Sequence, residues 1–84
     1  MYSVYVLKDK ASGRHYIGST ENLDRRLEEH SRKRPPFRVV LLENFRTKGE
    51  AFRREMYLKS GNGRRSLKNL IAGSPATHPA GERL

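Results

Sequence analysis

The chain has 84 residues and no cysteine, and its 18 Lys and Arg against 9 Asp and Glu give a net charge of +9 at pH 7. A chain this short forms one domain, and the lack of cysteine excludes both disulfides and a thiolate zinc site. So large an excess of positive charge favours a polyanionic partner, above all nucleic acid. From charge alone, a merely soluble basic domain and a ribosomal-type protein remain alternatives.

The N-terminal residues predict a β-hairpin. Tyr2–Leu7 is rich in β-branched and aromatic residues, and His15–Gly18 is a second, shorter segment of the same kind. Between them lies a polar segment in which Ser12 and Gly13 favour a turn. Because Lys8 interrupts the first segment at once, it is too short for a signal peptide or a membrane span. We therefore expect a cytoplasmic protein without a membrane association.

A helix and a third strand are predicted next. Asn22 is a good N-cap for a helix over Leu23–Lys33, which two consecutive prolines end. Phe37–Leu42 predicts a strand, and its continuous apolar run Val39–Leu42 is typical of a strand covered on both faces.

Two further helices complete the predicted domain. Thr47 and Glu50 have the spacing of a capping box, which opens a helix that runs to Ser60 and is ended by Gly61. Ser66–Ala72 predicts a short third helix.

The order of these elements is β-β-α-β-α-α. It predicts an α+β fold, with a small three-stranded, mainly antiparallel sheet flanked by about three helices. We assign residues 1–73 to one domain. Residues 74–84 contain two prolines and no hydrophobic period, which predicts a loosely structured C-terminal tail.

Ionisable residues lie on the apolar face of the first predicted helix. With about 100° between successive residues, Leu23 and Leu27 define an apolar stripe. His30 falls inside this stripe and Arg26 on its edge, whereas Arg25 points toward solvent.

The second predicted helix has the same property. Its apolar residues are Ala51, Phe52, Met56 and Leu58. Glu55 lies among them on the helical wheel, and Lys59 lies nearby with a stem long enough to carry its ammonium to solvent.

A buried charge without a partner costs several kcal/mol, so these residues admit two interpretations. In the first, Arg26 and Glu55 form a structural ion pair and His30 is an ordinary core residue. In the second, the sheet and both helices converge on one polar cleft, where Arg26 faces a phosphate and Glu55 a hard cation. Tyr5 and Tyr16 are likewise explained either by packing in their strands or by a role in that cleft.

Four sequence blocks, in this order, resemble the GIY-YIG nuclease family. They are Ser3–Tyr5 in place of Gly-Ile-Tyr, Tyr16–Gly18 unaltered, residues 19–30 ending in Leu-x-x-Arg-Leu-x-x-His, and residues 50–61, which match the family's second helix. The resemblance covers about residues 2–72 and implies a metal-dependent endonuclease that hydrolyses DNA.

The resemblance also implies roles for particular residues. Glu55 would be the single protein ligand of one divalent cation, Mg²⁺ or Mn²⁺. Tyr5 would orient or deprotonate the attacking water, and Arg26 would hold the scissile phosphate and offset its developing charge. Tyr16 and His30 would line the same pocket.

Less specific expectations concern nucleic-acid binding and partners. Arg25, Lys59 and Asn69 are candidate contacts to DNA, Asn69 because the family has an asparagine late in the domain. The chain has no room for a separate DNA-recognition domain, so it either acts with little sequence preference or takes specificity from a protein partner. A role in DNA repair or recombination is expected, with RNA left open as a substrate. The alternatives are a non-cutting nucleic-acid-binding domain of the same fold and a structural basic protein.

Overall fold

The computed structural model describes residues 1–33 and 36–73, so the expected C-terminal tail lies outside the described residues. The elements are β1 (Tyr2–Asp9), β2 (His15–Thr20), α1 (Leu23–Lys33), β3 (Phe37–Phe45), α2 (Lys48–Lys59) and α3 (Gly61–Ala72). Their order is the predicted one, and the α+β fold class is confirmed. No helix in the described part of the chain is long and apolar enough to cross a membrane.

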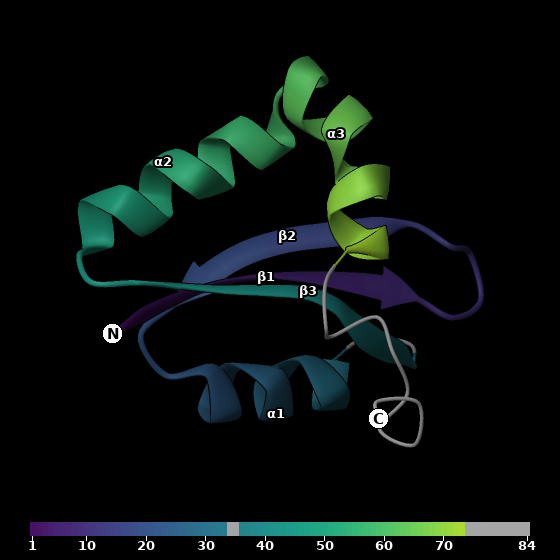
Figure 1. Cartoon of the computed structure of the whole chain (residues 1–84). Coiled ribbons are helices and arrows are strands. Elements are labelled where there is room, and N and C mark those ends of the chain that lie inside the picture. The colour runs from purple at the N-terminus through teal and green to yellow at the C-terminus, as the bar shows by residue number, and fades with distance from the viewer. Residues whose placement is uncertain (34–35, 74–84) are drawn as a thin grey trace.

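The three strands form one antiparallel sheet in the order β2-β1-β3. The central strand β1 places Tyr5 opposite Gly18 on one side and Leu42 on the other. Figure 1 shows that α1 covers one face of the sheet, whereas α2 and α3 cover the opposite face. Because side chains alternate along a strand, Tyr5 faces α1, while Val4 and Val6 face α2 and α3.

The hydrophobic core lies between the sheet and the α2–α3 pair. It consists of Val4, Val6, Ile17, Val40, Leu41, Ala51, Leu58 and Leu67. Leu58 is fully buried, and burial of one such side chain contributes about 1.5–3 kcal/mol. At the rim of this core, the Arg54 guanidinium donates hydrogen bonds to both carboxylate oxygens of Glu43, which fastens α2 to β3.

The strands extend further than their apolar segments predicted. β1 continues to Asp9, β2 to Thr20 and β3 to Phe45, because backbone pairing needs no apolar side chain. The expectation that β3 is covered on both faces is wrong for part of its run. The register shift between Val6 and Leu7 marks a bulge in β3, where Val40 has no partner on β1, and Leu42 is 37% exposed.

The junction between α2 and α3 corrects the predicted helix boundaries. α3 begins at Gly61, five residues before the predicted start at Ser66, because Ser60 both ends α2 and caps α3. The Ser60 hydroxyl accepts a hydrogen bond from the Gly63 amide. A Cβ on Gly63 would collide with the Tyr57 carbonyl, so glycine here permits close helix packing and does not break the helix.

The remaining helix boundaries agree with their capping signals. α1 has the predicted bounds, and the side-chain oxygen of Asn22 accepts a hydrogen bond from the Arg25 amide at 3.0 Å. The capping box of α2 is present, since Thr47 and Glu50 each accept a hydrogen bond from the other's backbone amide.

Candidate active site

Tyr5 lies at the centre of the candidate site, on the sheet face that α1 covers. Its side chain is fully buried, and its hydroxyl is 2.9 Å from Nε2 of His30. The ring lies over Gly18 on the neighbouring strand. A Cβ at that position would be 2.6 Å from the Tyr5 hydroxyl oxygen, so the Tyr5 ring can adopt this place only because residue 18 is glycine.

His30 is surrounded by aromatic rings from all three strands. Its ring centroid lies 5.7 Å from that of Tyr5, 5.1 Å from Tyr16 and 6.3 Å from Phe37, each with edge-to-face geometry. His30 itself is buried, as its place in the apolar stripe of α1 predicted. Tyr16 is exposed, so this cluster opens to solvent along the edge strand β2.

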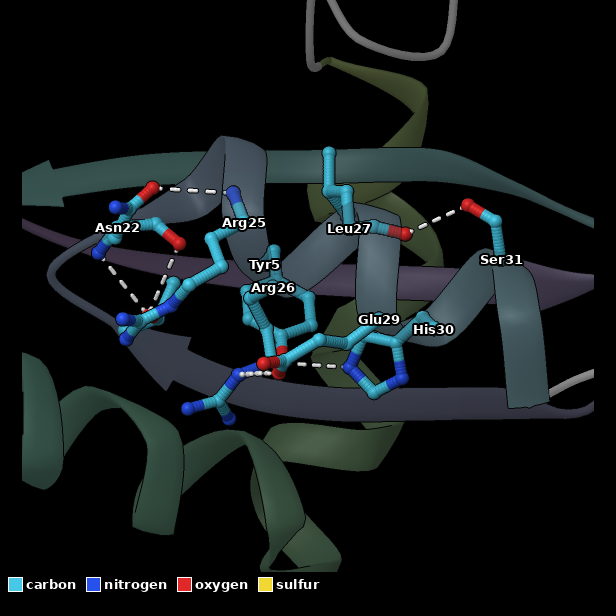
Figure 2. Close-up of polar contacts among 9 residues, drawn as sticks. Tyr5, Asn22, Arg25, Arg26, Leu27, Glu29, His30 and Ser31 are labelled. Atoms are coloured by element: carbon cyan, nitrogen blue, oxygen red, sulfur yellow. Dashed lines mark hydrogen bonds and ion pairs between the residues drawn. The ribbon is translucent and has the colours of Figure 1, made fainter.

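Arg26 lies beside this cluster, one turn before His30 on α1. Figure 2 shows the side chains of Arg26, Glu29 and His30 extending toward the end of the Tyr5 ring. The Nε atom of Arg26 is 3.3 Å from a carboxylate oxygen of Glu29, but it is buried without a hydrogen-bond partner among the described residues. Arg26, Glu29, His30 and Lys33 line an open cleft of about 400 Å³.

The electrostatic surroundings of Tyr5 oppose its ionisation. Burial raises the pKa of the Tyr5 hydroxyl, and the neighbouring Tyr16 raises it further. Arg26 acts in the opposite direction, whereas the negative charge of Glu55 again raises the pKa. Tyr5 is therefore a neutral phenol near neutral pH.

Glu55 approaches from the other side of the sheet. Its carboxylate accepts a hydrogen bond from the Ser19 hydroxyl at 2.6 Å and one from the Lys59 ammonium at 2.8 Å. Partial burial alone would raise the pKa of Glu55, but the hydrogen bonds from Lys59 and Ser19 outweigh it and lower the pKa. Glu55 is thus held ionised at the edge strand.

The expectation that both helices face one cleft is therefore wrong. α1 and α2 lie on opposite faces of the sheet, and Glu55 reaches the site only around the edge strand β2. The alternative, an Arg26–Glu55 ion pair, is also wrong, because Arg26 pairs with Glu29 and Glu55 with Lys59. Glu55 nevertheless lies close enough for its charge to affect the pKa of Tyr5.

The helical wheel made the buried face of α2 too wide. Ala51 and Leu58 are buried as predicted, but Phe52 and Met56 are 56% and 51% exposed. Glu55 therefore lies on the border of a narrow apolar face, where its carboxylate can reach the end of β2.

The three candidate DNA contacts lie in different surroundings. Arg25 is exposed on α1, as predicted. Lys59 is engaged by Glu55. Asn69 is exposed on α3.

Ser19 connects Glu55 to the sheet, although it was not among the residues predicted for the site. It directly follows Gly18, so the alternation of β2 turns it away from Tyr5 and toward α2. The orientation of Ser19 could be predicted from the alternation of β2. The position of Glu55 next to Ser19 could not, because this position depends on the face of the sheet that α2 covers.

The oxygen donors at Glu55 suit one hard divalent cation. Within residues 1–33 and 36–73, no group of three or more His, Asp or Glu side chains gathers into a metal cluster. Glu55 offers a single ionised carboxylate beside the Ser19 hydroxyl, with Lys59 on its second oxygen. One carboxylate, with water and phosphate oxygens, is a usual ligand set for Mg²⁺.

Comparisons with known proteins agree with this arrangement. The solution NMR structure of the UPF0213 protein BH0048 from Bacillus halodurans is similar to this one, with a TM-score of 0.59 and 34% sequence identity over 87% of this chain and 88% of that chain. A comparison with curated proteins found no match. A sequence model described as the GIY-YIG catalytic domain matches residues 1–69. This match spans most of the chain, and the protein therefore belongs to the GIY-YIG family, with a fold of the nuclease type.

Proposed function

We propose that the protein is a divalent-metal-dependent endonuclease that hydrolyses phosphodiester bonds in DNA. The observation that carries this proposal is the buried Nε of Arg26, which has no hydrogen-bond partner among the described residues although it lies beside the Tyr5–His30 pair. The Glu29 carboxylate 3.3 Å away offsets the charge of Arg26 without accepting a hydrogen bond from Nε, and a phosphate oxygen in the adjoining cleft would supply that acceptor.

Arg26 binds the scissile phosphate in this proposal. Its guanidinium presents several N–H donors in a fixed plane, which matches the geometry of phosphate oxygens. Glu29, 3.3 Å from Nε, keeps the Arg26 side chain directed along α1 toward the cleft. The charge that develops on the phosphate in the transition state is then offset by a group that is already in place.

Tyr5 and His30 position the attacking water. When Nδ1 of His30 carries the proton, Nε2 accepts the hydrogen bond from the Tyr5 hydroxyl. The Tyr5 oxygen can then accept a hydrogen bond from water, and His30 can receive the proton of the phenol. Because the pKa of Tyr5 is raised, this proton route through His30 matters more than spontaneous ionisation of Tyr5. Tyr16, whose ring packs against His30, borders the solvent side of the pocket.

Glu55 is the residue that would hold Mg²⁺ or Mn²⁺. A bound cation of this kind supplies polarisation of the phosphate and a lower pKa for a nearby water. Ser19 orients the carboxylate through its hydrogen bond, so Glu55 presents a fixed oxygen at the edge of β2.

The substrate class follows from charge. A charge of +9 favours a nucleic acid as the substrate. We place this activity in the cytoplasm, in DNA repair or recombination. The alternative is a nucleic-acid-binding domain of the same fold that does not cut.

A cleavage assay tests the proposal. Labelled single-stranded, duplex, flap and branched DNA, with a matched RNA, are incubated with Mg²⁺, Mn²⁺ or a chelator. We expect metal-dependent cutting of at least one DNA, which Tyr5→Phe abolishes. Tyr57→Phe removes a hydroxyl that is hydrogen-bonded to Ser66 within the described residues, away from Tyr5, and is the matched control. Binding without any cutting in either metal would favour the alternative, and cutting of the RNA alone would contradict DNA as the substrate.

A further inference from the structure

The end of the sheet near the β1–β2 hairpin carries a row of basic side chains. Lys8 on the central strand is paired with His15 on β2 and with Arg38 on β3. Residues paired in this way lie on the same face of a sheet, here the face that α2 and α3 cover. Lys8 and Arg38 place like charges directly opposite one another, which destabilises a sheet, so sheet stability does not explain this pair.

Arg14 and Arg64 add to this charge from the hairpin and from α3. Together with His15, Ile17 and Leu67 they line a cleft of about 370 Å³, here called the hairpin cleft. Two of these residues are apolar and buried, and the other three are basic and exposed. This cleft is separate from the one that Arg26 and His30 line.

The arginines of the hairpin cleft have guanidinium N–H donors that are available to a ligand. One N–H of Arg64 donates to the Lys59 carbonyl at 3.2 Å, which leaves the other donors of its guanidinium available. In the described part of the chain, neither Arg14 nor Arg64 forms an ion pair with a carboxylate. The Asp9 carboxylate feels the charge of Arg14, but it accepts hydrogen bonds from the backbone of its own turn.

The pKa of His15 is affected by the same positive charges. Burial lowers the pKa of the His15 imidazole, and the charges of Lys8 and Arg64 lower it further. An anion in the hairpin cleft would reverse the effect of these two charges and make protonation of His15 easier.

We propose that the hairpin cleft binds a backbone phosphate of the nucleic acid other than the scissile phosphate held at Arg26. This proposal rests on the nuclease function proposed above and extends its footprint. β2 connects the hairpin cleft with Glu55, since His15 lies four residues, or about 13 Å along the strand, before Ser19, whose hydroxyl donates to the Glu55 carboxylate. A chain of phosphates suits cations spread over such a length, because each phosphate meets a separate positive group.

The binding test uses the full chain, a short fluorescein-labelled duplex and a chelator, so that no cutting occurs. The dissociation constant is measured at several salt concentrations for the wild type and for the double variant Arg14→Gln with Arg64→Gln. The control double variant, Arg46→Gln with Arg53→Gln, removes the same charge from exposed positions near the start of α2. Arg14→Gln alone, which leaves the Arg64–Lys59 contact in place, guards against a folding defect.

We expect the slope of log Kd against log salt to become shallower by about two in the hairpin-cleft double variant and by about one in Arg14→Gln. The control pair should change the slope by less than the hairpin-cleft pair. An equal change in both pairs would show a general effect of net charge and overturn the proposal.

A second measurement needs no variant. The pKa of His15 in the wild type, followed by NMR, should rise when the duplex binds in the presence of chelator. An unchanged pKa of His15 would overturn the proposal. Cutting by the wild type with Mg²⁺ is scored separately. If the protein cuts DNA but the Arg14 and Arg64 variant shows no specific change in the salt slope, only the proposed role of the hairpin cleft is contradicted. If the protein does not cut but the salt slope changes as expected, only the nuclease function is contradicted.

Discussion

Substitution of Gly18 by Ala tests whether the candidate site depends on the place of the Tyr5 ring. The added Cβ would lie 2.6 Å from the Tyr5 hydroxyl oxygen and 2.8 Å from the ring carbon that carries it. The ring is fully buried and its hydroxyl is bonded to His30, so it has little room to move away. Tyr5 must therefore shift, and the hydrogen bond to His30 must lengthen or break.

The expected change in stability follows from these contacts. Adding one methyl group to a tightly packed site costs about 1–3 kcal/mol, and the loss of the Tyr5–His30 hydrogen bond contributes about 1 kcal/mol of that range. Urea unfolding measures this free energy, and single-turnover cleavage at saturating protein measures the rate. We expect the rate to fall by at least about tenfold, because a displacement of the Tyr5 oxygen of the order of 1 Å misplaces a catalytic group.

Gly61→Ala is the matched control. A Cβ on Gly61 meets nothing within 4 Å, so this variant should keep the stability and the rate of the wild type. If Gly18→Ala also keeps both, the Tyr5 ring is not held by its contact with Gly18, and the proposed geometry of the site is refuted.

The other predictions concern the charged groups of the site. Arg26→Ala should lower the single-turnover rate about 100-fold with little change in affinity for DNA. Arg25→Ala should instead weaken DNA binding modestly. Equal effects of the two substitutions would mean that Arg26 belongs only to the basic surface. Glu55→Ala should abolish cutting but leave DNA binding intact or slightly tighter, and Glu28→Ala is its control. If the Glu55 variant cuts at the wild-type rate, Glu55 has no role in the reaction. The pKa of Glu55 is lowered in the folded state, so the unfolded chain takes up the proton first. The stabilisation that Glu55 provides should therefore be present above its ordinary pKa of 4.5 and decline as the pH falls below it, and urea unfolding of Glu55→Gln should lack this decline.

Local signals in the sequence predicted the elements of the fold well. The caps at Asn22 and Thr47 fixed the starts of two helices, because a capping side chain interacts with residues only two or three positions away. The alternation of β1 placed Tyr5 on one face, and the period of α1 placed His30 inside the apolar stripe. Tyr5, Arg26 and His30 were therefore brought together correctly.

The sequence did not reveal which face of the sheet each helix covers. An apolar stripe indicates that a helix packs on something, but it carries no information about the side on which the chain crosses. Glu55 was consequently expected in the same cleft as Arg26, whereas it comes from the opposite layer and meets the site at the edge of β2. Phe52 and Met56, which looked like core residues, lie on the outside of α2.

The shared residue between α2 and α3 has a consequence for how the protein could measure its substrate. Ser60 terminates one helix and starts the next, and Gly63 brings the second helix against the Tyr57 carbonyl, so no loop separates the two. Glu55 on α2 and Arg64 on α3 are thereby parts of one stiff bent unit. On the proposed assignments, this unit holds Glu55 and Arg64 at a fixed separation. The backbone of the nucleic acid must therefore adjust its own conformation to reach both residues. Inserting a single residue at the bend would turn α3 by about 100° and change the position of Arg64 relative to Glu55.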